Sequence, residues 1–149
     1  NSDGKHGLVC DIKDLSESSQ WGCCCFMVTS QPQVGYGQAN TDNMIAAGCA
    51  NQGAAYNCIN SNAQGYNDWF LPSIHELEEM YSLKNIINPV ALSHGGSEFH
   101  IVTITSTSGG AYWSSTNWNN ERAYSVDNYG NVDMDSKFEQ KCVRAVREF

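Results

Sequence analysis

Residues 65–73 read Gly-Tyr-Asn-Asp-Trp-Phe-Leu-Pro-Ser and run directly into Ile-His-Glu-Leu-Glu-Glu-Met-Tyr at residues 74–81. Ser73 and Glu76 have the spacing of a capping box, in which each side chain accepts a hydrogen bond from the other residue's backbone N–H. Apolar residues then recur at helical spacing, with polar residues on the opposite side. This stretch therefore predicts a short amphipathic helix over residues 74–81 that packs on a core and follows an aromatic loop.

The size and charge of the chain limit its fold and its partners. Its 149 residues, 41% of them hydrophobic, can bury one core, so we expect a single domain over residues 1–149. The 16 acidic and 8 basic residues leave a net charge of −8, which disfavours nucleic acid and anionic membranes as partners. The sequence contains no apolar run near 18 residues, so we expect no membrane insertion.

The two helices and the strands that we expect come in separate blocks. One helix begins at Thr41 and the second covers residues 74–81, and Asn88-Pro89 ends the helical part. Short strands are expected near the start of the chain and through its last third. They cover residues 5–10, 21–28, 111–116, 122–127, 132–138 and 141–147. Helices followed by short antiparallel strands predict an α+β domain.

Seven cysteines in so short a chain indicate an oxidising compartment, so we expect a secreted or cell-surface, extracellular protein. The odd number leaves at least one thiol unpaired or paired between chains. Cys23, Cys24 and Cys25 are adjacent in an expected strand and would point to opposite faces, so they could not bind one metal ion together. This pattern favours disulfides and a spare thiol over a metal site.

Cys49 and Cys58 are the only pair for which we predict a disulfide. They lie nine residues apart, too far to bridge along one continuous helix, but a break at residues 51–53 would let them meet. Such a bridge would stabilise the fold by roughly 2–3 kcal/mol. The pairing of the remaining cysteines stays open, namely Cys10, Cys23, Cys24, Cys25 and Cys142.

Three blocks at residues 65–73, 112–116 and 143–147 resemble a bacterial C-type-lectin-like family, the one named after the C-terminal domain of the Legionella collagen-like adhesin. Residues 6–9 and 20–22 are similar to its N-terminal motifs, so the resemblance extends from near Lys5 to Phe149. It implies two helices packed on a twisted antiparallel sheet with long loops and adjacent terminal strands. It also implies a C-terminal module of a longer surface protein that binds sulfated polysaccharide as a homotrimer.

The residues expected to contact a ligand lie in the β-rich part of the chain. Trp118, Asn119, Asn120, Glu121 and Arg122 are predicted to form one ligand-facing loop, because C-type lectins place amide and carboxylate oxygens in such a loop to bind sugar hydroxyls. We expect no cofactor. Calcium is the alternative, since further carboxylates lie close by in sequence, at Asp127, Asp133 and Asp135, although acidic turns are usually only solvated.

Four of the eight basic residues lie in the last thirteen positions, as Lys137, Lys141, Arg144 and Arg147. Lys137 and Lys141 are predicted to supply charge for a sulfated ligand, and three such patches around a trimer axis would bind a long chain by avidity. The alternative is that the two arginines pair with nearby acids such as Glu139 and Glu148 and carry no binding function.

We predict that the protein is not an enzyme, because no histidine is near the cysteines in sequence to activate a nucleophile. The function expected is that of an adhesin recognition domain that binds polysaccharide, with sulfated glycosaminoglycan as a candidate ligand. The alternative is a phage or bacterial fibre tip, or a trimerisation domain, with a protein or cell-surface polymer as its ligand. Exposure of Trp118 and Tyr129 would favour binding, and their burial would favour a scaffold.

Overall fold

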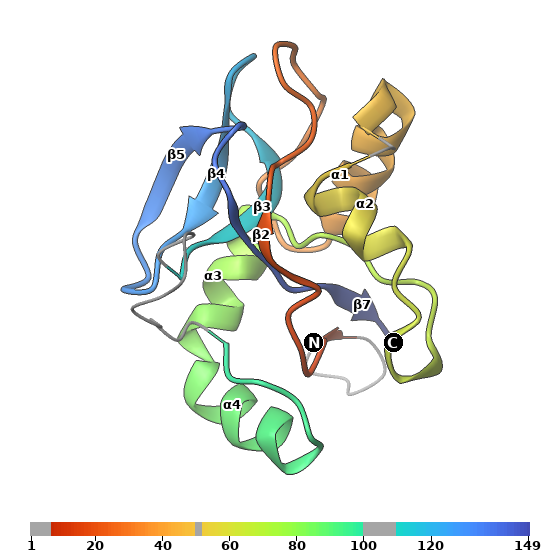
Figure 1. Ribbon diagram of the computed structural model, residues 1–149, viewed down its shortest axis with the longest axis vertical. Coiled ribbons are helices and arrows are strands. Elements are labelled where there is room, and N and C mark those ends of the chain that lie inside the picture. The colour runs from red at the N-terminus through yellow and green to blue at the C-terminus, as the bar shows by residue number, and fades with distance from the viewer. Residues whose placement is uncertain (1–6, 50–51, 100–109) are drawn as a thin grey trace.

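The computed structural model describes residues 7–49, 52–99 and 110–149 and shows helices packed around a curled sheet (Figure 1). The described helices are α1 (Gly37–Met44), α2 (Ala54–Ile59), α3 (Ile74–Ser82) and α4 (Lys84–Ser93). The described strands are β1 (Leu8–Cys10), β2 (Ser16–Ser19), β3 (Tyr112–Asn117), β4 (Arg122–Val126), β5 (Val132–Ser136), β6 (Lys141–Val143) and β7 (Val146–Glu148). The predicted α+β class is confirmed. None of the described helices is long and apolar enough to span a membrane.

The strands form two sheets that share the C-terminal segment of the chain. The larger sheet has the order β2-β6-β3-β4-β5, with β3 and β6 parallel and the other neighbours antiparallel. The strand predicted over residues 141–147 is instead broken at Arg144 and Ala145, so that β6 joins this sheet while β7 pairs with β1. The antiparallel β1–β7 pair places the terminal strands side by side, as predicted.

Helix α3 begins where the capping box predicts. Ser73 Oγ accepts a hydrogen bond from the Glu76 N–H at 3.3 Å, and Glu76 Oε2 accepts one from the Ser73 N–H at 2.7 Å. The apolar side of the helix packs against β3 and β4, with Leu77 fully buried. Phe70, in the preceding loop, exchanges backbone hydrogen bonds with Val146 and so joins this loop to β7.

The helical content exceeds the prediction: the described residues contain four α-helices, not two. The first begins at Gly37 instead of Thr41, and the Thr41 hydroxyl donates to the Gly37 carbonyl from inside the helix at 2.8 Å. Pro89 was expected to end the helical part but lies within α4. Residues 21–28 form an irregular loop and not a strand, and the more polar β2 occupies the sheet position beside β6.

The cysteine pairing differs from the prediction of a Cys49–Cys58 bridge, which is wrong. Cys49 is bonded to Cys23, with a Cα–Cα distance of 5.1 Å, and Cys58 is a buried free thiol. The Ala54 N–H donates to the carbonyls of Gln20 and Trp21, which holds the loop before Cys23 against the start of α2. Local chain geometry could not show this contact between distant segments.

The remaining cysteines follow no pattern visible in the sequence. Cys24 and Cys25 are bonded to each other, while Cys10 and Cys142 form no disulfide within the described ranges. The close packing of the loop before Cys23 against the start of α2 depends on glycine. A Cβ on Gly53, whose φ is +119°, would lie 2.6 Å from the Cα of Gly22. This contact leaves no room for a side chain between the loop and α2.

Candidate ligand-binding turn

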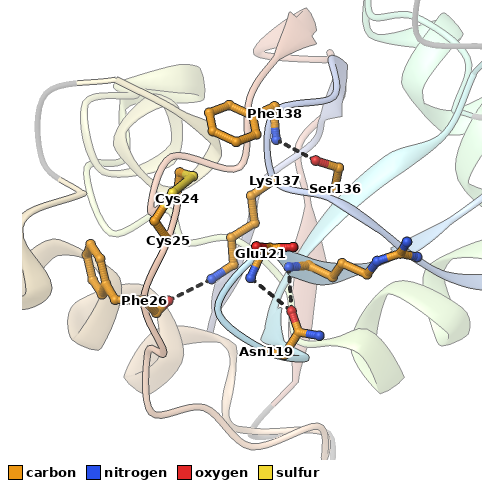
Figure 2. Close-up of a disulfide and its surroundings, with 9 residues drawn as sticks. Cys24, Cys25, Phe26, Asn119, Glu121, Ser136, Lys137 and Phe138 are labelled. Carbon is orange, nitrogen blue, oxygen red and sulfur yellow. Dashed lines mark hydrogen bonds between the residues drawn. A yellow bond between two sulfur atoms is a disulfide. The ribbon is translucent and has the colours of Figure 1, made fainter.

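The turn formed by residues 118–122 joins β3 to β4 and is fixed by one asparagine. The Asn119 Oδ1 accepts hydrogen bonds from the backbone N–H groups of Glu121 at 2.9 Å and Arg122 at 2.8 Å. The N–H groups of Trp118 and Asn119 in turn donate to the Arg122 carbonyl. Figure 2 shows Asn119 and Glu121 in this arrangement. The backbone of the turn is therefore held in one conformation without help from a ligand.

Trp118 is the exposed aromatic residue of this turn, with 50% of its surface accessible. Its ring meets Tyr124 of β4 edge to face, with ring centroids 5.5 Å apart and an interplanar angle of 77°. Edge-to-face contact is a favoured geometry for aromatic pairs and leaves part of the indole facing solvent. The five residues predicted to form one loop are thus brought together on one exposed turn.

The floor of the turn is polar and buried. Asn117 donates its backbone N–H to Ser30 Oγ at 2.8 Å, and its Nδ2 donates to the Asn119 carbonyl at 3.1 Å. The Asn120 carbonyl accepts a hydrogen bond from the Cys25 N–H at 2.9 Å. Contacts from residues 25–30 therefore support a turn that is almost one hundred positions away in the chain.

Sequence reasoning missed this supporting loop. Phe26 and Met27, next to the Cys24–Cys25 disulfide, are both exposed, and Phe138 is exposed beyond β5. Figure 2 shows Phe26 and Phe138 on either side of the disulfide. The only sequence signal for this loop was the apolar pair Phe26 and Met27 directly after three cysteines. We interpreted that pair as part of a strand over residues 21–28, so the loop was not predicted.

Lys137 is buried, contrary to the prediction that it supplies charge for a sulfated ligand. Its side chain is 1% exposed, and its Nζ donates to the Phe26 carbonyl at 2.9 Å (Figure 2). The same Nζ lies 4.5 Å from the centroid of the Trp21 ring. Burial lowers the pKa of Lys137 to about 8, because the charged amine loses its hydration.

Lys141 is also internal, which corrects the second half of that prediction. Its Nζ forms ion pairs with Asp135 at 2.9 Å and Glu139 at 3.2 Å and lies 5.1 Å from the centroid of the Trp113 ring. A lysine can turn inward where an aromatic face and oxygen acceptors replace its water. Both lysines therefore belong to the core, and neither presents a free cation to a ligand.

The two arginines are paired within the protein, as the alternative held, but with other acids. Arg144 is buried and its Nε binds Asp14 Oδ1 at 2.6 Å, while Nη2 donates to the Ser97 and Glu98 carbonyls. Arg147 binds both Asp68 oxygens at 2.7 Å. The hydrogen bonds from Arg147 lower the pKa of Asp68. All four basic residues near the C-terminus are thus engaged internally.

The three candidate calcium ligands, Asp127, Asp133 and Asp135, have different contacts and do not form one metal-binding group. Asp127 accepts hydrogen bonds from Tyr129 N–H and from both the backbone and the side chain of Asn131. Partial burial acts to raise its pKa, but these hydrogen bonds outweigh it and the pKa of Asp127 is lowered. Asp135 binds Ser125 Oγ and Lys141, and Asp133 is exposed. Within the described ranges, no three His, Cys, Asp or Glu residues form a group that could hold a metal ion.

The family model for the Lcl C-terminal domain matches residues 11–147, nearly the whole chain. The protein therefore belongs to the Lcl C-terminal domain family, and the resemblance seen in the sequence is confirmed. A search of curated proteins finds no match.

Proposed function

We propose that this chain is the recognition domain of an extracellular adhesin and binds polysaccharide through the 118–122 turn. The observation that carries the proposal is the half-exposed Trp118 ring on a turn that Asn119 holds rigid. An aromatic face stacks on a sugar ring, and amide and carboxylate oxygens beside it accept hydrogen bonds from hydroxyl groups. Because the turn is fixed before binding, little conformational entropy would be lost.

The proposed ligand is an uncharged polysaccharide and not a sulfated one. Lys137, Lys141, Arg144 and Arg147 are all bound within the protein, and the chain has a net charge of −8. A polyanion would meet unfavourable electrostatic potential without a local group of free cations. Hydroxyl groups of a neutral glycan carry no such penalty.

The other parts of the proposal concern location, assembly and chemistry. The Cys23–Cys49 bond is suited to a secreted or cell-surface domain, because disulfides persist in oxidising compartments. We propose a homotrimer, in which three weak sites gain affinity by avidity. We propose neither catalysis nor a cofactor. The burial that raises the pKa of Cys10 to about 11 keeps this thiol protonated and a poor nucleophile at neutral pH.

A glycan array, followed by titration calorimetry with the best neutral oligosaccharide, tests the proposal. Trp118→Ala should lower affinity about tenfold, because a stacking ring at the centre of a contact contributes more than 1 kcal/mol. Tyr56→Ala is the matched control, since Tyr56 is an exposed aromatic on α2 and not on the proposed binding turn. Equal affinity of Trp118→Ala and the unaltered protein would refute the role of the turn.

Two further arms of the array separate the remaining ligand classes. Binding should be unchanged by EDTA and should be weak on heparin at low salt. Loss of binding with EDTA would restore the calcium alternative, and strong salt-sensitive heparin binding would contradict the proposal of a neutral ligand. The absence of any glycan binding would favour the second candidate.

The second candidate is a trimerising cap or fibre tip whose ligand is a protein or cell-surface polymer. Apolar residues on α4 favour it: Ile86 is 65% exposed, and Val90, one turn later, is also exposed. Such a stripe is typical of a face that another chain covers. Analytical ultracentrifugation of Ile86→Asp would show a shift from trimer to monomer if this stripe joins the copies, whereas Asn85→Asp should leave assembly unchanged.

A further inference from the structure

A cavity of about 530 Å³ lies between the β1–β7 pair and α3 and shares no lining residue with the 118–122 turn. Its walls come from both terminal strands, from the loop before α1, and from α3 and the first part of α4. A volume of this size is within the range of small-molecule sites, which extends from about 300 to 1,000 Å³. Nothing in the proposed polysaccharide function uses this cavity.

The walls of the cavity are largely apolar. Met80 and Leu83 line it from the helical side, and Leu8 and Val146 line it from the strands. Phe149 closes one edge, where its ring lies against Gly7: a Cβ at Gly7 would approach that ring to 2.7 Å. These surfaces suit the hydrocarbon part of a ligand.

Glu76 shapes the cavity but is not available to a ligand cation. Its carboxylate is buried and accepts hydrogen bonds from the N–H groups of Gly35 at 2.7 Å, Ser73 at 2.7 Å and Gly37 at 3.4 Å. The contact with Gly35 fixes the loop that forms the outer wall. The Glu76 charge is therefore already stabilised by backbone dipoles and the start of α3.

Glu79 and Glu148 are different, because both are exposed and also line the cavity. Neither carboxylate forms an ion pair or a side-chain hydrogen bond within the described part of the chain. Among the described residues that line the cavity there is no lysine, arginine or histidine. Its described lining thus combines an apolar interior with two carboxylates that have no cationic partner in the described ranges.

We propose that this cavity binds a small organic cation, an ammonium group carried on an apolar body. The ammonium would pair with Glu79 and Glu148, and the body would lie against Met80 and Leu83. A neutral apolar ligand would desolvate the carboxylates without compensation, and an anion would be repelled by them. A bare metal ion would find too few oxygen ligands among these apolar walls.

The test is a titration of the ¹⁵N-labelled protein with 4-phenylbutylammonium, followed by NMR. The amide signals of Gly7 and Gly35, at the strand and loop walls, should shift in a saturable way. A dissociation constant of about 1 mM is expected, from roughly 0.4 kcal/mol for each non-hydrogen atom of the probe. The anion 4-phenylbutyrate, which has a similar apolar body, should bind at least about tenfold more weakly.

Variants then locate the charge that is responsible. Glu79→Gln and Glu148→Gln should each weaken binding of the ammonium probe about threefold, the effect expected of an exposed ion pair, and the double variant about tenfold. Glu78→Gln is the matched control, because Glu78 is an exposed residue of α3 that does not line the cavity. Its affinity should stay within about twofold of that of the unaltered protein.

Two results would overturn the proposal. One is equal affinity for the ammonium and the carboxylate probe, which would show that charge plays no part. The other is the absence of saturable shifts at Gly7 and Gly35 up to about ten times the expected dissociation constant. Neither result bears on glycan binding, because Trp118 and its turn lie outside the cavity.

Discussion

Trp113 and Trp118 lie five positions apart on the same strand and its following turn, yet they occupy opposite environments. Trp113 is fully buried, its Nε1 donates to the Ser19 carbonyl at 2.8 Å, and Lys141 covers its ring. Trp118 is half exposed and contacts only the edge of Tyr124 among the aromatic residues described. The same residue type therefore builds the core in one place and a surface in the other.

Buried aromatic rings such as that of Trp113 also explain why the basic residues near the C-terminus lie inside the protein. Lys137 and Lys141 cover the indoles of Trp21 and Trp113, and Arg144 lies 5.4 Å from the centroid of the Phe99 ring. Cations in this region stabilise the fold through aromatic faces, carbonyls and carboxylates. The comparison teaches that basic residues concentrated in sequence need not form a basic surface. Four predictions test the contrast between the buried region and the turn.

The largest effect is expected at Arg144. Arg144→Met would leave the largely buried carboxylate of Asp14 without its cation, so the free energy of unfolding should fall by about 3–5 kcal/mol. Arg122→Met on the exposed turn is the control, and it should change stability by less than about 0.5 kcal/mol. Urea unfolding measures both variants. A similar loss from the two substitutions would contradict the contrast.

The two disulfides should also differ in how much each one stabilises the fold. Cys23→Ser opens a bridge with a sequence separation of 26, which corresponds to a loss of about 3.5 kcal/mol in the chain-entropy model. The Cys24–Cys25 bond joins neighbours and closes no long loop, so the double variant Cys24→Ser and Cys25→Ser should lose less than about 1 kcal/mol. Chemical unfolding under non-reducing conditions compares them, and a larger loss from the double variant would reverse the order.

Lys137 should give the buried region a distinct pH dependence. Its folded pKa of about 8 lies below the usual 10.5, so the unfolded chain binds more protons between these values. The contribution of Lys137 to the free energy of unfolding should therefore rise by about 1 kcal/mol from pH 7 to pH 9. Lys137→Met should lack this rise. The raised pKa values of Cys10 and Cys58 act in the opposite direction, because these thiols begin to ionise near pH 9 in the unfolded chain only. The contribution of Lys137 is therefore read as the difference between the unaltered protein and Lys137→Met.

That pH prediction is checked by urea unfolding at pH 7, 8 and 9 at constant ionic strength. Lys141→Met serves as the comparison, since it removes the other lysine that covers an indole. A parallel pH profile for the unaltered protein and Lys137→Met would show that Lys137 is solvated like an ordinary surface lysine.

The smallest effect on stability is expected at Asn119. Asn119→Ala removes two hydrogen bonds from an exposed turn and should lower the free energy of unfolding by about 0.5–1 kcal/mol. The turn would lose its fixed shape, so glycan affinity should fall as far as in Trp118→Ala. Asn120→Ala is the control for stability alone, because the contact that Asn120 makes with Cys25 uses its backbone carbonyl, while its side chain belongs to the proposed ligand-binding turn. Full affinity in Asn119→Ala would show that rigidity is not required.

Much of the fold could be predicted because its signals are local. The capping box at Ser73 and Glu76 needs only residues three apart, and it was confirmed with both hydrogen bonds present. The exposed turn at residues 118–122 followed from a polar break between two β-rich segments. The short motifs at residues 65–73, 112–116 and 143–147 were sufficient to identify the family, whose model matches residues 11–147.

Features that depend on distant segments were predicted poorly. Cys23 meets Cys49 because hydrogen bonds from the Ala54 N–H hold the loop before Cys23 against the start of α2, and no local spacing reports that contact. Helix α4 continues through Pro89, although proline usually disfavours such a helix interior. The strand expected over residues 21–28 has the right alternation but has no partner strand among the residues that the structure describes.

The sequence by itself determined the α+β class, the capped helix α3, the family and the turn that carries Trp118. These depend on patterns that act within a few residues. Only the tertiary structure decided that Lys137 and Lys141 face inward and that Cys49 pairs with Cys23. The physical reason is that a charge is buried, or a thiol paired, according to neighbours in space, and the indoles and carboxylates that surround these groups come from distant parts of the chain.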